Sequence, residues 1–293
     1  MHPSTLGQLA QQEKTRREVL HKSDLIPPLP DLVAVVLTAL NKQETEPQDL
    51  EQLMRNDQVL VAKMLAMVNS PFYGMSRTIR TVRESVMVLG FRGVRSLVLA
   101  TSTAKFLQRD YSCYGHDGKG LWLHAVSVAA GAKALARECK LGADAAEQLF
   151  VAGLLHDIGK MLLVTYLADS GKRYDGKQSV TEFERQVIGI DHTEAGALVT
   201  AKWSLAPEIQ EVIKSHHERP AGPAARSVAV VRLADALAHE TGVGYLPGRA
   251  PVASILPEDL AALSLTNETW SAVRDVVVAK MDEAVAALAG LGS

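Results

Sequence analysis

The sequence predicts an all-α protein. Apolar residues recur at three- and four-residue spacing along nearly the whole chain, and no segment shows the strict alternation of a half-buried strand. Internal repeats and low-complexity tracts are also absent. A chain of helices without intervening strands has to bury its apolar faces by packing helix on helix.

The N-terminal half is predicted to form short helices after a polar, amphipathic arm at 5–22. Pro47 suits the first turn of a helix, and Asp57 is suited to cap the next one. Gly90 is expected to end a helix in a left-handed conformation. The predicted helices of this half span residues 31–40, 47–55, 57–68, 82–89 and 94–107.

A polar segment with three glycines, residues 108–120, is expected to separate this half from a second group of helices. Residues 242–257 form a looser stretch rich in glycine and proline. The terminal helix has apolar residues at helical spacing, which is typical of a docking helix or a dimer face. The predicted helices of the second group span residues 121–139, 144–168, 181–189, 192–203, 207–217, 226–240 and 266–288.

The composition is that of an ordinary globular protein, with 47% hydrophobic and 22% charged residues in 293. A net charge of −2 and 5% aromatic residues give no footprint for nucleic acid or an anionic membrane. The two cysteines are too few for a disulfide framework. No apolar N-terminal segment is present, and no apolar run reaches the roughly 18 residues of a membrane span. We therefore expect a cytoplasmic protein that binds neither membrane nor nucleic acid.

His156 and Asp157 are adjacent within the apolar stretch 151–164, which the pattern places in the interior. A buried carboxylate is costly without a partner. The pair therefore indicates a bound cation, a hydrogen-bond network or another functional constraint.

Further polar residues lie in apolar or helical surroundings upstream and downstream of this pair. Each one alone also fits a structural role: a satisfied core histidine, a residue beside the N-cap Asp191, imidazoles at a helix C-terminus, or an ion pair between Arg232 and Asp235. Together they supply the mixed nitrogen and oxygen ligands that suit iron, manganese, zinc, cobalt or nickel. The residues of this set are His124, His192, His216, His217 and Asp235.

Several motifs agree in order and spacing with a known family. The histidines and aspartates above resemble the metal ligands of the HD superfamily of phosphohydrolases, and the region before them is similar to the N-terminal half of the HDOD domain, the HD-related output domain of bacterial signalling proteins. The resemblance covers residues 20–240. The motifs that carry it before residue 100 are Ile26-Pro27-Pro28-Leu29-Pro30, Asp57-Gln58-Val59-Leu60, Asn69-Ser70-Pro71-Phe72-Tyr73-Gly74 and Val86-Met87-Val88-Leu89-Gly90.

The resemblance implies a helical N-terminal subdomain packed on an HD-like helical half, in a bacterial protein that acts mainly as a regulator. A signalling protein is then the expected partner, and a nucleotide or cyclic dinucleotide is a further candidate ligand; the sequence leaves the oligomeric state open. The expected parts are an arm at 1–24, the N-terminal subdomain at 25–108, the HD-like subdomain at 119–240 and a C-terminal extension at 241–293.

The resemblance also implies one or two divalent transition-metal ions, with iron or manganese favoured over zinc, cobalt and nickel. Asp157 would bridge two ions, an arrangement that suits phosphoryl displacement. The first ion would be held by His124, His156, Asp157 and Asp235, and the second by Asp157, His192, His216 and His217.

Similarity to the HD-GYP phosphodiesterases of cyclic di-GMP suggests a competing function, a metal-dependent phosphohydrolase. Asp157 and Lys160 are then the candidate catalytic residues, with Lys160 contacting substrate phosphate; the alternative for Lys160 is a surface lysine that extends past an apolar helix. Two features depart from those enzymes. The Asp-Gly-x-Gly-Tyr-Pro signature is missing after Glu218, and Gly120 stands where a glutamate would hold a third metal ion.

The region between residues 77 and 95 holds a local basic cluster that has two interpretations. It could receive a phosphate or an acidic partner, or form a solvated face balanced by nearby acids. Its members are Arg77, Arg80, Arg83, Arg92 and Arg95.

Overall fold

The computed structural model describes residues 12–19, 26–42, 44–251 and 254–288, and in this part of the chain the structure is helical without strands. The prediction of an all-α protein is confirmed. Residues 12–19 are also helical. The named helices are α2 (Asp31–Leu40), α3 (Pro47–Met54), α4 (Gln58–Val68), η2 (Pro71–Tyr73), α5 (Val82–Leu107), η3 (Ser112–Tyr114), α6 (Gly120–Glu138), α7 (Ala143–Leu155), α8 (Lys160–Ser170), α9 (Val180–Ile188), α10 (His192–Lys202), α11 (Pro207–Ser215), η4 (Gly222–Ala224), α12 (Ala225–Thr241), α13 (Pro257–Ala262) and α14 (Asn267–Leu288).

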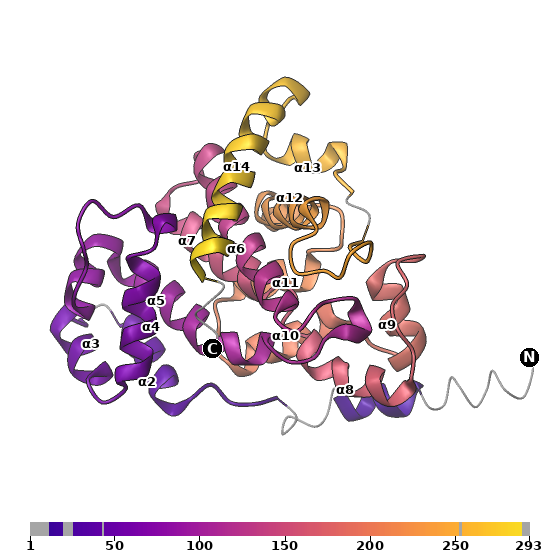
Figure 1. Cartoon of the computed structure of the whole chain (residues 1–293), viewed down its shortest axis with the longest axis horizontal. Helices are drawn as coiled ribbons and strands as arrows, with labels where there is room; N and C mark the ends of the chain where they lie inside the picture. Colours follow the sequence, from indigo (N-terminus) through magenta and orange to yellow (C-terminus); the bar gives the residue numbers. More distant parts are fainter. Residues whose placement is uncertain (1–11, 20–25, 43, 252–253, 289–293) are drawn as a thin grey trace, which may run out of the picture.

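The helices α2 to α5 form one side of the molecule, on the left in Figure 1. Their ends follow the local signals in the sequence. Pro47 opens α3, and the Asp57 carboxylate accepts a hydrogen bond of 2.8 Å from the Leu60 backbone N–H at the start of α4. Gly90 has a φ of 70° and interrupts α5, as expected for a residue that ends one helical segment before the next begins.

The basic cluster beside these helices is largely paired. Arg77 forms an ion pair with Glu84, Arg92 forms one with Asp144, and Arg95 donates a hydrogen bond of 2.8 Å to the Asn41 side chain. These partners favour the interpretation as a solvated, charge-balanced face over an open anion site.

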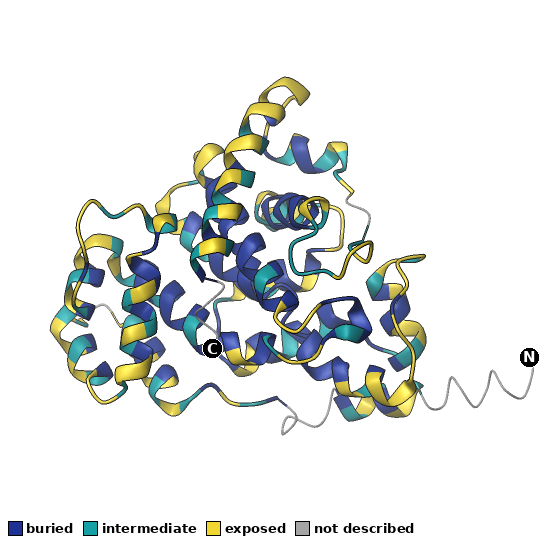
Figure 2. Ribbon diagram, in the orientation of Figure 1, coloured by how far each residue is buried: buried dark blue, intermediate teal, exposed yellow. Residues whose placement is uncertain are grey.

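Helix α6 lies in the middle of the fold and packs against α7, α12 and α14. Small residues allow this close packing. A Cβ added to Gly131 would lie 3.2 Å from the Ala234 Cβ on α12, and one added to Gly153 would lie 2.9 Å from the Val128 carbonyl oxygen. Figure 2 shows the buried residues concentrated on these central helices. Three elements that carry candidate ligands are therefore held within a few ångströms of one another.

The single helix predicted at 144–168 is wrong, because α7 ends at Leu155 and α8 begins at Lys160. The turn between them contains the His156–Asp157 pair. Gly159 in this turn touches α10, where an added Cβ would lie 2.0 Å from the His192 carbonyl oxygen. Helix α10 therefore packs directly on this turn, and His156 and Asp157 in the turn are buried.

Two helical stretches, Val82–Leu107 and Ala143–Ser170, are long and apolar enough to cross a membrane when length and composition alone are considered. The expectation that the chain holds no such stretch is thus corrected. The most apolar window of Val82–Leu107 is 56% buried inside the structure, and that of Ala143–Ser170 is 89% buried. Core helices of a folded protein are buried in the same way. The localisation remains a prediction.

The C-terminal region adds a helix that the sequence did not predict, α13, immediately after the glycine- and proline-rich stretch. The terminal helix α14 begins and ends close to the predicted bounds and packs along α6. Its interpretation as a docking helix agrees with this contact. The proposed division of the chain into an arm, two subdomains and an extension stays a prediction.

Candidate metal centre

The first group of candidate ligands joins α6, the α7–α8 turn and α12. His124 Nε2 lies 3.1 Å from Asp235 Oδ1, and His156 Nε2 lies 3.7 Å from the same oxygen. All three side chains are buried. One ligand atom from each lies within 4.8 Å of the others, a spacing that suits ligands of one ion.

Asp157 lies between this group and a second one. Its Oδ2 is 3.4 Å from His156 Nε2 and 3.8 Å from His124 Nε2. Its other oxygen, Oδ1, is 3.3 Å from His192 Nε2. A carboxylate that offers one oxygen to each group has the position of a ligand that bridges two ions.

The second group consists of three histidines. His192 Nε2 lies 3.3 Å from His216 Nε2 and 3.1 Å from His217 Nε2. Asp191 caps α10, as the sequence predicted, by accepting a hydrogen bond of 2.9 Å from the Thr193 backbone N–H, and this places His192 in the first turn. His216 and His217 follow the end of α11. His192 and His216 are buried, whereas His217 is exposed at the rim.

The hydrogen bonds of these rings place the proton of each neutral imidazole on Nδ1, so that Nε2 is the nitrogen that points inward. His216 Nδ1 donates to the Ile213 carbonyl oxygen at 2.7 Å, and His156 Nδ1 donates to a backbone carbonyl at 2.7 Å. His192 Nδ1 donates to the Glu184 carboxylate at 2.7 Å. A neutral imidazole that donates through Nδ1 has a lone pair at Nε2. Two such lone pairs face each other at 3.3 Å between His192 and His216, so a cation, either a metal ion or a proton, has to lie between them.

The first group shows the same need for a partner. Both ring nitrogens of His124, and Asp235 Oδ1, are buried, and none of them makes a hydrogen bond of good geometry among the described residues, although His124 Nε2 and Asp235 Oδ1 lie 3.1 Å apart. Buried polar atoms of native proteins are nearly always satisfied, because an unmade hydrogen bond leaves the cost of desolvation uncompensated. A metal ion between His124 Nε2 and Asp235 Oδ1 would satisfy both atoms. The residues present therefore fit the metal ions that the donor set implies.

The electrostatics of the site prepare these groups for a cation. Burial alone would raise the pKa of Asp157, but the nearby Lys160 ammonium holds it well below its ordinary value. Burial would also raise the pKa of Asp235, but the neighbouring His239 holds that pKa well below its ordinary value. Burial lowers the pKa of His216 to about 3. Ionised carboxylates and neutral imidazoles are the protonation states that metal ions bind.

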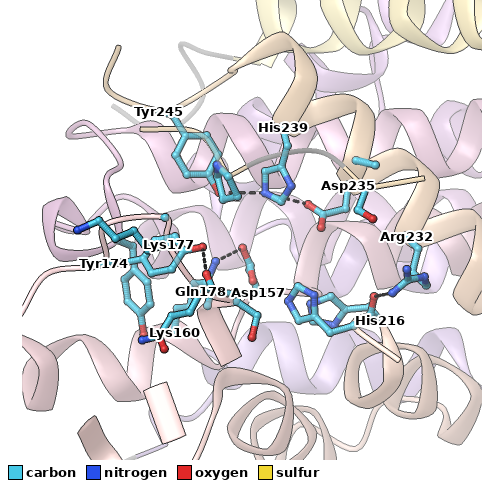
Figure 3. A pocket seen from close by; sticks show the side chains of 18 residues that line it. Asp157, Lys160, Tyr174, Lys177, Gln178, His216, Arg232, Asp235, His239 and Tyr245 are labelled. Carbon is cyan, nitrogen blue, oxygen red and sulfur yellow. Dashed lines mark hydrogen bonds and ion pairs between the residues drawn. The ribbon is translucent and has the colours of Figure 1, made fainter. Parts of the chain in front are cut away.

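Lys160 is buried, with 4% of its surface exposed, so its interpretation as a surface lysine is wrong. Its ammonium donates to Asp157 Oδ2 at 2.7 Å and lies 5.3 Å from the centre of the Tyr114 ring. Figure 3 shows Lys160 beside Asp157 among the residues that line a cavity. The side chain therefore neutralises the Asp157 carboxylate and also lines the cavity.

Glu184 is a fully buried residue of the site that the sequence interpretation missed. Its carboxylate accepts hydrogen bonds from the Tyr114 hydroxyl at 2.7 Å and from the His192 backbone N–H at 2.9 Å, in addition to His192 Nδ1. Carboxylates in this position orient a metal-binding imidazole. A signal was present in the sequence, because Glu184 interrupts the apolar stripe of α9 between Val180 and Ile188.

His239 and Tyr245 are two further residues that the sequence interpretation missed. His239 Nε2 lies 3.5 Å from Asp235 Oδ1 and 3.1 Å from the Tyr245 hydroxyl. The segment around Tyr245 returns to the site because Gly244 packs on Gly120, where a Cβ would lie 1.9 Å from the Gly244 carbonyl oxygen. That contact leaves no room at position 120 for a glutamate.

The alternative interpretation of Asp235, an ion pair with Arg232, is wrong. Arg232 Nε instead donates to Asp259 Oδ1 at 2.7 Å, across to α13. Asp235 is thereby left to the imidazoles of the first group.

A cavity of about 520 Å³ opens beside both groups of ligands. The buried residues Asp157, Asp235, His216 and Lys160 line it together with the more exposed Lys177 and Tyr245 (Figure 3). Its volume falls within the range of ordinary small-molecule sites. Four of the candidate ligands, Asp157, His216, His217 and Asp235, are therefore accessible to a molecule bound in this cavity.

Residues 26–219 match the family model of the HDOD domain. This range contains all the candidate ligands predicted from the sequence except Asp235. Among curated proteins, the chain is 24% identical over 271 residues to an uncharacterized protein of Treponema pallidum (strain Nichols), covering 91% of this chain. The chain spans about half the length of that relative, 51%.

Solved structures have the same fold. An HDOD domain protein of unknown function from Geobacter sulfurreducens is 26% identical, with a TM-score of 0.68 over 96% of this chain and 98% of that one. A Shewanella amazonensis SB2B protein, provisionally named a phosphohydrolase, is 22% identical, with a TM-score of 0.71 over 92% of this chain and 97% of that one. A Marinobacter aquaeolei VT8 protein, provisionally named a signal transduction protein, is 18% identical, with a TM-score of 0.71 over 97% of this chain and 66% of that one.

Proposed function

Because the chain belongs to the HDOD family, we propose that it is a cytoplasmic bacterial signalling module that holds a two-metal centre and acts by binding a protein partner. His124, His156, Asp157 and Asp235 hold the first ion in this proposal. Asp157, His192, His216 and His217 hold the second. Iron or manganese is favoured, because the donor set mixes imidazoles with carboxylates and contains no thiolate.

The observation that carries the proposal is the facing pair of lone pairs on His192 and His216, 3.3 Å apart with Asp157 Oδ1 beside them. Backbone and carboxylate acceptors fix the Nδ1 protons on the outer side of both rings. Such an arrangement is stable when a cation occupies the space between the rings. The buried nitrogens of His124 and Asp235 Oδ1 make no hydrogen bond of good geometry. A second cation bound between them would satisfy His124 Nε2 and Asp235 Oδ1, which supports a second ion.

A regulatory role is supported by the family and by the signalling context that the Marinobacter relative suggests. In this role the bound ions stabilise one arrangement of α6, α10, α11 and α12, since their ligands come from all four helices or the turns beside them. The free energy of metal binding then adds to the stability of the folded form. A partner that contacts these helices would bind best to the metal-loaded protein.

Hydrolysis of a phosphoester is the competing function, and the cavity of about 520 Å³ beside the ligands favours it. Metal ions, when bound, would polarise a phosphoryl oxygen and supply a nucleophile. Asp157 would hold both ions in place. Lys160, whose ammonium faces the cavity, would bind and orient the phosphate of a nucleotide or cyclic dinucleotide and offset its charge.

Metal analysis of protein purified without oxygen and without added chelator tests the proposal. We expect two transition-metal ions per chain, no turnover on a panel of phosphodiesters and nucleotides, and a partner captured by wild-type protein but not by a metal-free preparation. Turnover that depends on the ions would instead support the hydrolase. Protein that contains no metal, and takes up none from Mn²⁺ or Fe²⁺ solutions, would refute both functions.

A further inference from the structure

We propose that Asp259 and Arg232 form a positioning pair that holds the His216–His217 turn and thereby sets the affinity for the second metal ion. The inference rests on the proposed metal centre. Both residues lie beyond the range that matches the family model, 26–219. Asp259 belongs to α13, which the sequence did not predict to be helical.

The contacts of Arg232 connect α13 directly to the metal centre. Its Nε donates to Asp259 Oδ1 at 2.7 Å and its Nη2 lies 3.4 Å from Asp259 Oδ2, a two-point contact with one carboxylate. Its Nη1 donates to the His216 carbonyl oxygen at 3.3 Å, and Figure 3 shows this contact beside the cavity. Among the described residues, Arg232 forms hydrogen bonds with these two partners only. The guanidinium therefore links Asp259 to the peptide group between His216 and His217.

This peptide group is where support is needed. His216 follows the last residue of α11, and carbonyl groups at the end of a helix have no partner within it. Arg232 supplies the missing donor. The Nδ1–Ile213 hydrogen bond orients the ring of His216, but the backbone contact to Arg232 fixes the peptide group that leads into the exposed His217. The two imidazoles that face His192 depend on this turn for their spacing.

Asp259 holds the guanidinium rigidly. Its side chain is 1% exposed and that of Arg232 is 11% exposed. Asp259 Oδ2 also accepts a hydrogen bond of 3.1 Å from the Leu256 backbone N–H at the start of α13. A planar guanidinium that meets one carboxylate at two points is restricted in orientation as well as in position.

Charge gives Asp259 a second effect. A guanidinium at hydrogen-bond distance from a ligand residue repels a divalent ion nearby, and a low-dielectric interior strengthens that repulsion. The Asp259 carboxylate neutralises it. Removal of this charge should therefore lower the affinity for the second ion in two ways, through a looser turn and through an unpaired positive charge. The ligands of the first ion keep their own supports.

Titration of metal-free protein with Co²⁺, followed by visible absorption, tests the pair. We expect two binding events in the wild type. In Asp259→Asn the second event should weaken by about 10- to 100-fold, the usual range for residues that support metal ligands, while the first changes by less than about threefold. Glu258→Gln is the matched control, because Glu258 is the neighbouring residue of α13 and pairs with Arg219 at the surface; its two events should match the wild type.

A second variant separates positioning from the folding of α13. Arg232→Gln removes the contact with His216 and leaves Asp259 to cap α13, so it should also weaken the second event, but by less than Asp259→Asn does, because it also removes the positive charge that repels the ion. If the pair acts as a unit, the double variant should weaken it no more than the single ones do. Wild type that binds no Co²⁺ would refute the metal centre itself. Wild type with two events, together with unchanged second events in both single variants, would refute only the positioning pair.

Discussion

Replacing Asp157 with alanine is expected to remove both metal ions from the protein. The carboxylate offers Oδ2 to the His124 and His156 side and Oδ1 to His192. No other described carboxylate lies within 4 Å of nitrogens from both groups. Metal analysis of Asp157→Ala should therefore find less than one ion per chain, and added Mn²⁺ should no longer raise the melting temperature.

The same substitution leaves the Lys160 ammonium buried without its partner at 2.7 Å. Loss of one member of a buried ion pair typically costs about 3–5 kcal/mol of unfolding free energy. Lys160→Met added to Asp157→Ala should restore most of that stability without restoring the metal. Asp169→Ala, at an exposed position of α8, serves as the control and should change neither quantity. Retention of two ions by the double variant would show that Asp157 is not a bridging ligand.

Replacing Gly159 with alanine is expected to destabilise the fold at the turn that carries the ligand pair. An added Cβ would lie 2.0 Å from the His192 carbonyl oxygen and 2.5 Å from the Gly196 backbone nitrogen. Backbone atoms cannot move aside by rotating, so α8 and α10 have to separate. Insertion of one methyl group into such a contact should cost about 3 kcal/mol, at the upper end of the usual range for overpacking. Urea unfolding of the metal-free protein measures it.

The displaced α10 carries His192, so Gly159→Ala should also lower the affinity for the second metal ion more than the affinity for the first. Gly118→Ala is a suitable control, because a Cβ there meets nothing within 4 Å and its φ is not positive. Its unfolding free energy should stay within about 0.5 kcal/mol of wild type, as surface substitutions usually do. Equal stability of the two variants would mean that α8 and α10 are not in the contact described.

Much of the fold was predictable because its signals are local. Proline at the first turn of α3, aspartate before α4 and α10, and the left-handed Gly90 act within a few residues of where they stand. A single sequence shows these signals directly. The turn at 156–159 was not predictable in this way, since it packs against α10, a helix that lies more than 30 residues further along the chain.

The candidate ligands themselves were recognisable, because histidine and aspartate stand out in apolar helices. The residues that support them were not. Tyr245 lies in a stretch with the composition of a loop and Asp259 follows shortly after it, and their partners are set by tertiary packing. The ion pair predicted between Arg232 and Asp235 obeyed helical spacing, yet the closer carboxylate came from α13.

The most direct test of the two-metal centre is anomalous diffraction from a crystal of the protein grown with Mn²⁺. Two anomalous peaks are expected, one on each side of the Asp157 carboxylate, with His124, His156 and Asp235 around the first and His192, His216 and His217 around the second. The absence of a peak between these side chains in the Mn²⁺-grown crystal, or a single peak coordinated away from Asp157, would contradict the account.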